Sequence, residues 1–336
     1  MRKVTVVFTG TRYKSINIEE SVRHVKKIFK DCETILSTND AEFAKCVERK
    51  KIFDKTILIL DDEKSLPGIK FSDAEQKNNI NKQIQTAYRG IKEASNNLVL
   101  RLRTDHQLIS DKILSFWHLS ESINSESNEN QGRIITSALF SINPRYMEKM
   151  AWHISDMFQF GYKEDLLKYF SAPYYTEEYA IWYEKEKHSM NANWYELNFR
   201  SKYAVEQWLA LHYIFSKEED FPINKSHNIN ETIIAEFENT WPIYFFIIHP
   251  YDLGLLTPKF KSSMTYCNTQ CYTTIDSFRL LDLPSQLDKD EISFLLNWKP
   301  SMLTRLLRNI IISTPVGLLK KILSLNFIKR IRKFVR

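Results

Sequence analysis

The chain has 336 residues, of which 43% are hydrophobic and 26% are charged, with only 7 Gly and 10 Pro, which excludes a disordered or fibrous chain. Its net charge of +6 is local, because residues 301–336 hold nine Lys or Arg and no Asp or Glu, leaving 38 basic and 41 acidic residues elsewhere. The body is therefore slightly acidic, so nucleic acid is not an expected partner. The sequence contains no run of 18 apolar residues, so no membrane-spanning helix is predicted.

The first hundred residues alternate short apolar runs with helical patterns. Strands are predicted at residues 4–8, 33–36, 56–60 and 98–102. Helices are predicted at residues 18–29, 41–51 and 76–95, with a polar loop around Pro67 and Gly68 before the last of them. This order predicts an α/β fold with a mostly parallel central sheet flanked by helices.

The rest of the chain adds fewer clear elements. A strand is predicted at residues 133–140, followed by a segment at 152–169, a helix at 203–215 and a late buried strand at 241–248. We divide the chain into a catalytic domain at residues 1–250, a covering segment at 251–300, and a helical extension at 301–336.

Polar residues gather where the predicted strands end. They are Thr9, Gly10 and Thr11 after the first strand, Ser37 and Thr38 after the second, and Asp105 after the fourth. Ligands of open parallel sheets bind at this edge, so these positions are candidate cofactor-binding residues. None of the loops has the glycine pattern of a dinucleotide fold or a P-loop.

The fourth strand carries the most informative segment. By alternation, Arg101, Arg103 and Asp105 lie on one face, and the intervening leucines lie on the other. Two arginines suit the oxygens of a diphosphate, and a carboxylate suits a divalent cation such as Mg²⁺ or Mn²⁺. The alternative is a strand end that carries only an internal Arg–Asp pair.

Several short motifs together resemble the WavE lipopolysaccharide-synthesis family of glycosyltransferases, over roughly residues 4–215. The matching segments are Leu36-Ser37-Thr38, Asn79-Ile80-Asn81-Lys82-Gln83, Gly90-Ile91, Leu100-Arg101-Leu102-Arg103-Thr104-Asp105, His153-Ile154-Ser155-Asp156, Phe160-Gly161 and Glu206-Gln207.

The resemblance implies a GT-A-like nucleotide-diphosphosugar transferase fold and a nucleotide-sugar donor. It also implies that Asn81 and Gln83 face the nucleotide, and that Asp105 stands in the acidic metal-binding motif. Arg103 occupies the place of the first Asp of that motif. The requirement for Mn²⁺ or Mg²⁺ therefore stays open, because Arg101 and Arg103 could partly replace the cation.

Glycosyl transfer usually needs a carboxylate base for the acceptor hydroxyl. Asp156 and Glu206 are the two catalytic candidates after the fourth strand. We favour Asp156 as the base and Glu206 as a contact to the acceptor or to the base. Since Glu206 opens a predicted helix, we expect the helix dipole to keep it ionised. The alternatives are a turn-forming Asp and an ordinary carboxylate at a helix start.

The basic segment 301–336 alternates apolar and cationic residues in the manner of interfacial amphipathic helices. We expect it to bind an anionic membrane surface; the alternative is packing on the body with a solvated basic face. Four cysteines are few for this length and indicate free thiols in a reducing compartment. The expected location is cytoplasmic, peripheral on the inner membrane.

The expected partners are a nucleotide sugar and a lipid-linked or lipopolysaccharide, O-antigen or capsule acceptor. Two other functions remain open. A sugar nucleotidyltransferase would normally carry a glycine-rich phosphate loop, and only Gly10 is present. A non-catalytic membrane-recruited assembly protein is favoured by the reduced acidic motif.

Overall fold

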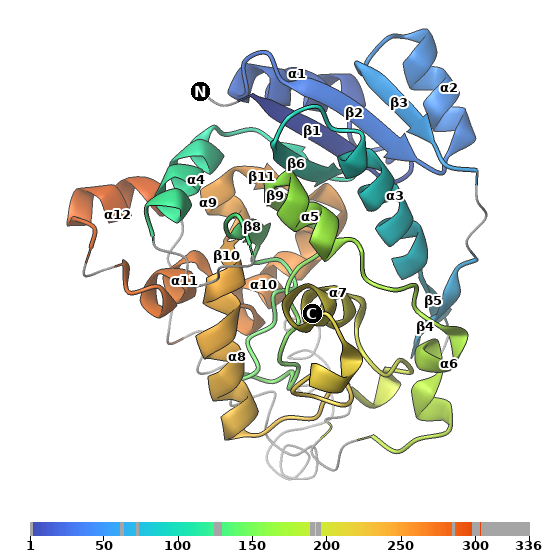
Figure 1. Ribbon diagram of the computed structural model, residues 1–336, viewed down its shortest axis with the longest axis vertical. Helices are drawn as coiled ribbons and strands as arrows, with labels where there is room; N and C mark the ends of the chain where they lie inside the picture. Colours follow the sequence, from blue (N-terminus) through green and yellow to red (C-terminus); the bar gives the residue numbers. More distant parts are fainter. Residues whose placement is uncertain are drawn as a thin grey trace, which may run out of the picture.

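The computed structural model describes residues 3–60, 64–71, 74–123, 130–188, 192, 196–283, 286–297 and 303 (Figure 1). The predicted membrane-binding helices at 301–336 lie outside the described residues, apart from Leu303. Within the described residues, no helix combines the length and the hydropathy needed to cross a bilayer.

Strands and helices alternate through the first half of the chain. The strands are β1 (Val4–Thr9), β2 (Glu33–Thr38), β3 (Lys55–Leu58), β4 (Leu66–Phe71), β5 (Ala74–Asn78), β6 (Leu98–Arg103), β7 (Gln107–Leu108), β8 (Ile134–Ser137), β9 (Phe158–Tyr162), β10 (Phe245–Ile248) and β11 (Leu255–Leu256). The helices are α1 (Ile18–Ile28), α2 (Ala41–Arg49), α3 (Ile80–Lys92), α4 (Lys112–Ser122), α5 (Lys163–Tyr169), α6 (Glu177–Ala180), α7 (Val205–Phe215), α8 (Glu231–Tyr244), α9 (Pro250–Leu253), α10 (Met264–Gln270), α11 (Thr274–Leu280) and α12 (Lys289–Leu295). Short 3₁₀ turns include η2 (Glu196–Asn198) and η4 (Pro258–Ser263).

In the described residues, a seven-stranded sheet has the order β10-β8-β9-β6-β1-β2-β3. All of its pairings are parallel except those of β9, which runs antiparallel to both neighbours. The predicted α/β class with a mostly parallel sheet is therefore confirmed. Strand order reverses beside β1, because β2 and β3 extend to one side of it and β6 lies on the other.

Helices cover both faces of the sheet (Figure 1). One apolar core joins Val7 and Val99 to helices α3, α5, α7 and α8. The other joins Leu98, Leu100 and Leu102 to helices α1, α2, α4 and α11. The predicted alternation along β6 is thus confirmed, since its leucines and its valine belong to different cores.

Three element boundaries differ from the prediction. Residues 66–71 and 74–78 pair as strands β4 and β5 where a loop was predicted, so α3 begins at Ile80 instead of residue 76. In the segment 152–169, only Phe158–Tyr162 is a strand. Residues 241–244 end helix α8 before β10 begins at Phe245. Apolar runs were misassigned because periodicity does not separate a short buried strand from the end of a buried helix.

Gly90 allows α3 to lie close against the sheet. A Cβ at this position would be 2.5 Å from Val7 Cγ1 and 2.9 Å from Ser37 Cβ. We expect Gly90→Ala to lower the free energy of unfolding, because overpacking costs about 1–3 kcal/mol while the gain in helix propensity is about 1 kcal/mol. Urea unfolding measures the difference.

Gly161→Ala is the matched control, since its added Cβ would be 3.6 Å from the nearest atom, an ordinary contact. Equal stability of the two variants would show that α3 can move away from the sheet without cost.

Candidate functional site

The candidate site lies at the carboxyl edge of the sheet, where the strand order reverses between β1 and β6. The loops after these strands are joined: Thr104 donates from its N–H to Thr9 O (3.0 Å) and from its hydroxyl to Thr11 O (2.6 Å). Gly10 has a φ of +114°, and a Cβ there would be 3.0 Å from Thr104 Oγ1. Glycine therefore permits the turn that joins the two loops.

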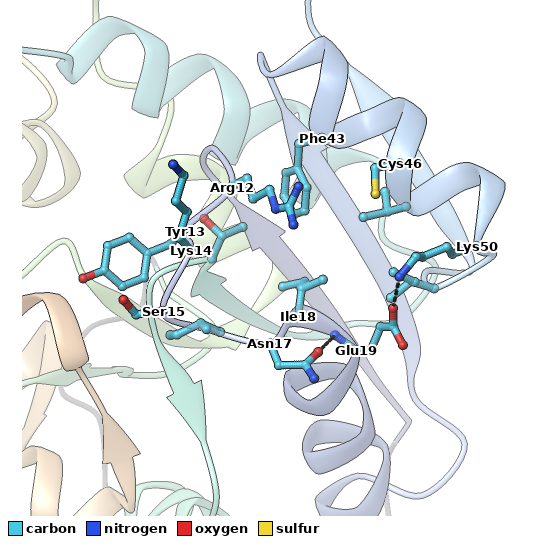
Figure 2. Close-up of a pocket in the computed structure, with 14 residues that line it drawn as sticks. Arg12, Tyr13, Lys14, Ser15, Asn17, Ile18, Glu19, Phe43, Cys46 and Lys50 are labelled. Atoms are coloured by element: carbon cyan, nitrogen blue, oxygen red, sulfur yellow. Dashed lines mark hydrogen bonds and ion pairs between the residues drawn. The ribbon is translucent and has the colours of Figure 1, made fainter.

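A hollow of about 460 Å³ opens beside this junction (Figure 2). Its walls come from residues 12–19, from α2 and the turn that follows it, and from Thr104. Figure 2 shows the Lys50–Glu19 ion pair near Asn17 at one end, and Arg12 and Lys14 toward the other. Because Glu19 already neutralises Lys50, the remaining cations give the hollow a positive character suited to an anionic ligand.

Asp105 is held by Arg103 through a two-pronged ion pair. Arg103 Nε donates to Oδ1 (2.9 Å) and Nη2 donates to Oδ2 (2.7 Å). His106 Nδ1 is 2.6 Å from Oδ1, and Lys259 Nζ is 3.4 Å from Oδ2. Burial acts to raise the pKa of Asp105, but the hydrogen bonds and charges of His106 and Arg103 outweigh it and keep the pKa well below its usual range. The predicted internal Arg–Asp pair is therefore present, although it is mostly buried rather than at the surface.

The surroundings of Asp105 do not fit a divalent cation. A carboxylate offers about four lone-pair positions, and Arg103, His106 and Lys259 together fill four contacts. A metal would have to displace Arg103 and would meet the charge of Lys259. Among the described residues, no cluster of three or more His, Cys, Asp or Glu could hold a metal ion. The metal role predicted for Asp105 is not supported.

Arg101 holds the backbone of Asp156 in position through a hydrogen bond. It is 2% exposed, and its guanidinium donates to the backbone oxygen of Asp156 and to Gln159 Oε1 (3.1 Å). Burial lowers the pKa of Arg101 to about 10, so it stays charged at neutral pH. The structure uses Nη1 of Arg101 to hold Asp156 and Gln159, while the buried Nε has no hydrogen-bond partner among the described residues, and the phosphate contact of Arg101 stays a prediction.

Asp156 lies just before β9, at the same edge as the end of β6. One carboxylate oxygen, Oδ2, accepts from Gln83 Nε2. The other, Oδ1, is buried and has no hydrogen-bond partner among the described residues. The structure thus leaves one acceptor oxygen of Asp156 unused, and its role as the catalytic base stays a prediction.

Glu206, near the start of α7, faces His153, with Oε2 3.4 Å from Nε2. Burial raises the pKa of Glu206 to about 8, and the charge of Asp156 adds to the shift. The prediction that the helix dipole keeps Glu206 ionised was therefore wrong, because desolvation and a like charge outweigh the dipole. Burial also lowers the pKa of His153 to about 4, so the pair is neutral near pH 7.

His153 is held by a strained stretch of backbone. Its Nδ1 donates to Phe140 O (2.8 Å), and its own carbonyl accepts from Ile142 N (3.0 Å). Phe140 and Trp152 have φ values of +68° and +65°. Such conformations cost on the order of 1–3 kcal/mol each and concentrate at functional sites.

The side chains predicted to bind a cofactor at the ends of β1 and β2 mostly form hydrogen bonds within the protein. Ser37 donates to Thr86 O (2.7 Å), and Thr38 Oγ1 accepts from Asp40 N (3.0 Å). Both side chains are fully buried. Thr9 is also buried, and its hydroxyl has no partner among the described residues.

The two amides predicted to face the nucleotide have different surroundings. Asn81 is buried and bonds the backbone of Tyr175 twice, donating to its O (3.0 Å) and accepting from its N (2.7 Å). Gln83 reaches Asp156 instead. Asn81 therefore fastens α3 to a distant loop, whereas Gln83 belongs to the acid cluster.

Sequence reasoning did not select His106 or Lys259. His106 directly follows Asp105, and that adjacency was the available signal. Lys259 comes from η4, far along the chain, and no local pattern relates it to Asp105. The tertiary structure alone brings it to the site.

A family model described as WavE lipopolysaccharide synthesis matches residues 6–311. No curated protein matches the chain significantly. HddC from Yersinia pseudotuberculosis matches with a TM-score of 0.29 and 11% identity, over 50% of this chain and 79% of that one.

A CMP:2-keto-3-deoxy-manno-octonic acid synthetase in complex with CTP also matches with a TM-score of 0.29, with 12% identity over 53% of this chain and 81% of that one. Such low scores do not assign either protein's activity to this chain.

The raised pKa of Glu206 predicts a pH-dependent stability. Because its folded pKa of about 8 exceeds the usual 4.5, the unfolded chain loses this proton first, and stability falls as pH rises across that interval. Each pH unit is worth at most about 1.4 kcal/mol per group. We expect Glu206→Gln, which cannot ionise, to lose less stability than the wild type between about pH 5 and pH 8.

Thermal unfolding across this pH range measures the effect. Glu20→Gln, on the exposed side of α1, is the control and should follow the wild type. If Glu206→Gln also follows the wild type, Glu206 is ionised in the folded protein.

Proposed function

The chain belongs to the WavE lipopolysaccharide-synthesis family, and we propose that it is a glycosyltransferase that moves a sugar from a nucleotide-diphosphate donor to a lipopolysaccharide, O-antigen or capsule acceptor. The finer assignment of a GT-A-like fold belongs to the same proposal. It is supported by a parallel-rich sheet whose order reverses at β1, with helices on both faces.

One observation carries the proposal. A cationic hollow of about 460 Å³ reaches the loop after β6, and the end of the same strand carries the two arginines that contact Asp105 and Asp156. Thr104, which lines the hollow, lies between Arg103 and Asp105 in the sequence. Ligands of open α/β sheets bind at this reversal point, so donor and catalytic groups would meet there.

In the proposed reaction, the acceptor hydroxyl oxygen attacks the anomeric carbon and its proton passes to Asp156. The bond between the anomeric carbon and the diphosphate oxygen breaks, and its electron pair leaves with the nucleoside diphosphate. Arg103, with a side chain about one-fifth exposed, is placed to neutralise the charge that develops on the leaving group. A single base and direct attack give inversion of the anomeric centre.

Glu206 does not compete with Asp156 as the base at neutral pH. A carboxyl group with a pKa of about 8 is mostly protonated there and can donate but not accept. We assign Glu206 and His153 to orienting the acceptor side of the site. Binding of residues 301–336 to an anionic inner-membrane surface remains part of the proposal and would bring the enzyme to a lipid-linked acceptor.

The role of Asp156 as the base is tested by removing its carboxylate. Purified protein is incubated with a panel of nucleotide sugars and membrane extract as acceptor, and release of nucleoside diphosphate is measured. We expect release from one donor and a loss of about 100-fold or more in Asp156→Asn, the usual contribution of a positioned base. Asp111→Asn, at an exposed position before α4, should retain wild-type activity.

Other outcomes assign other functions. Release of pyrophosphate from a nucleoside triphosphate and a sugar phosphate would identify a nucleotidyltransferase. If no donor is used and an Asp156→Asn chain supports polysaccharide assembly in cells as well as the wild type does, the protein is a non-catalytic assembly factor.

A further inference from the structure

The charges around Asp105 leave an excess of positive charge at the site. Asp105 carries one negative charge, and Arg103 and Lys259 each carry one positive charge within ion-pair distance of it. Burial lowers the pKa of His106, so its ring adds no charge at neutral pH. One net positive charge therefore remains at the point where the metal of an acidic motif was expected.

Lys259 reaches this point from a separate part of the fold. The strand β11 pairs with β7, immediately after Asp105 and His106, and η4 follows β11. Phe260 packs on Arg103, with 5.6 Å from the guanidinium carbon to the ring centroid. It also contacts the ring of Phe140 at 5.6 Å between centroids. The backbone beside Lys259 is thus anchored on the site.

The side chain of Lys259 nevertheless stays accessible. It is 48% exposed, whereas the side chains of Arg103 and Asp105 are 20% and 8% exposed. Its ammonium group sits above the carboxylate at 3.4 Å, a looser contact than those of Arg103. An anion arriving from solvent would therefore meet Lys259 first and Arg103 next.

We propose that Arg103 and Lys259 together bind the diphosphate of the donor in place of a divalent cation, with Asp105 holding the two cations in position. This inference rests on the proposed glycosyl transfer. When the bond between the anomeric carbon and the diphosphate breaks, the added negative charge falls between a forked guanidinium and a mobile ammonium group. The acceptor proton goes to Asp156 as before, so no further reactant is needed.

The test compares two lysines of the same 3₁₀ turn. Lys259→Gln removes the proposed contact, Lys259→Arg keeps its charge, and exposed Lys261→Gln is the matched control. We expect wild-type release of nucleoside diphosphate to be the same in EDTA and in Mn²⁺. We expect Lys259→Gln to lower kcat by about 10-fold or more, since removing one electrostatic stabiliser usually has at least this effect.

Lys259→Arg should recover most of the rate, and Lys261→Gln should match the wild type. A purely structural role for Lys259 would instead lower thermal stability and leave the rate of the folded variant unchanged. Equal rates for Lys259→Gln and Lys261→Gln, or loss of wild-type activity in EDTA, would overturn the inference.

A binding experiment separates this inference from the proposed function. Titration calorimetry with inorganic pyrophosphate in EDTA needs no turnover. Binding that is weakened about 10-fold in Lys259→Gln, with a smaller salt dependence, supports the anion site even if no sugar donor is used. Turnover that requires Mn²⁺, together with unchanged pyrophosphate binding in Lys259→Gln, keeps the transferase and rejects the site.

Discussion

Two arginines at the end of the central strand β6 need anionic partners, and the loops at this edge of the sheet are arranged to supply them. A guanidinium buried without partners would cost several kcal/mol, so Arg101 and Arg103 can be interior only where oxygens surround them. Asp105 supplies these oxygens from the turn that follows the strand, and Asp156 supplies a backbone oxygen from the loop before β9. The positions of both loops are fixed by this requirement.

The same charges decide the ionisation of the surrounding groups. A second charged carboxylate beside Asp156 in this buried region would add like charge. Burial, together with the charge of Asp156, therefore raises the pKa of Glu206 to about 8. His153 stays neutral for the corresponding reason, since burial opposes its protonation. Glu206 is therefore suited to donate a proton near neutral pH, a chemical capacity that burial and a neighbouring carboxyl group give it.

The fold places this cluster and the cationic hollow at the same edge of the sheet, where the strand order reverses at β1. Thr104, in the loop after β6, donates two hydrogen bonds to the end of β1 and the loop that follows it. The WavE family match spans residues 6–311, so it includes β11 and η4, which carry Lys259 to Asp105. The segment predicted only as a cover thus contributes a charged group to the centre of the site.

The sequence by itself determined β1, β2, β3 and β6, the two faces of β6 and the edge at which polar residues gather, because these follow from alternation and from local turn residues. It also selected Asp156 and Glu206. Only the tertiary structure decided that β9 runs antiparallel, that burial raises the pKa of Glu206, and that Lys259 meets Asp105. These properties depend on burial and on contacts between residues distant in the chain, and the local sequence pattern specifies neither burial nor such contacts.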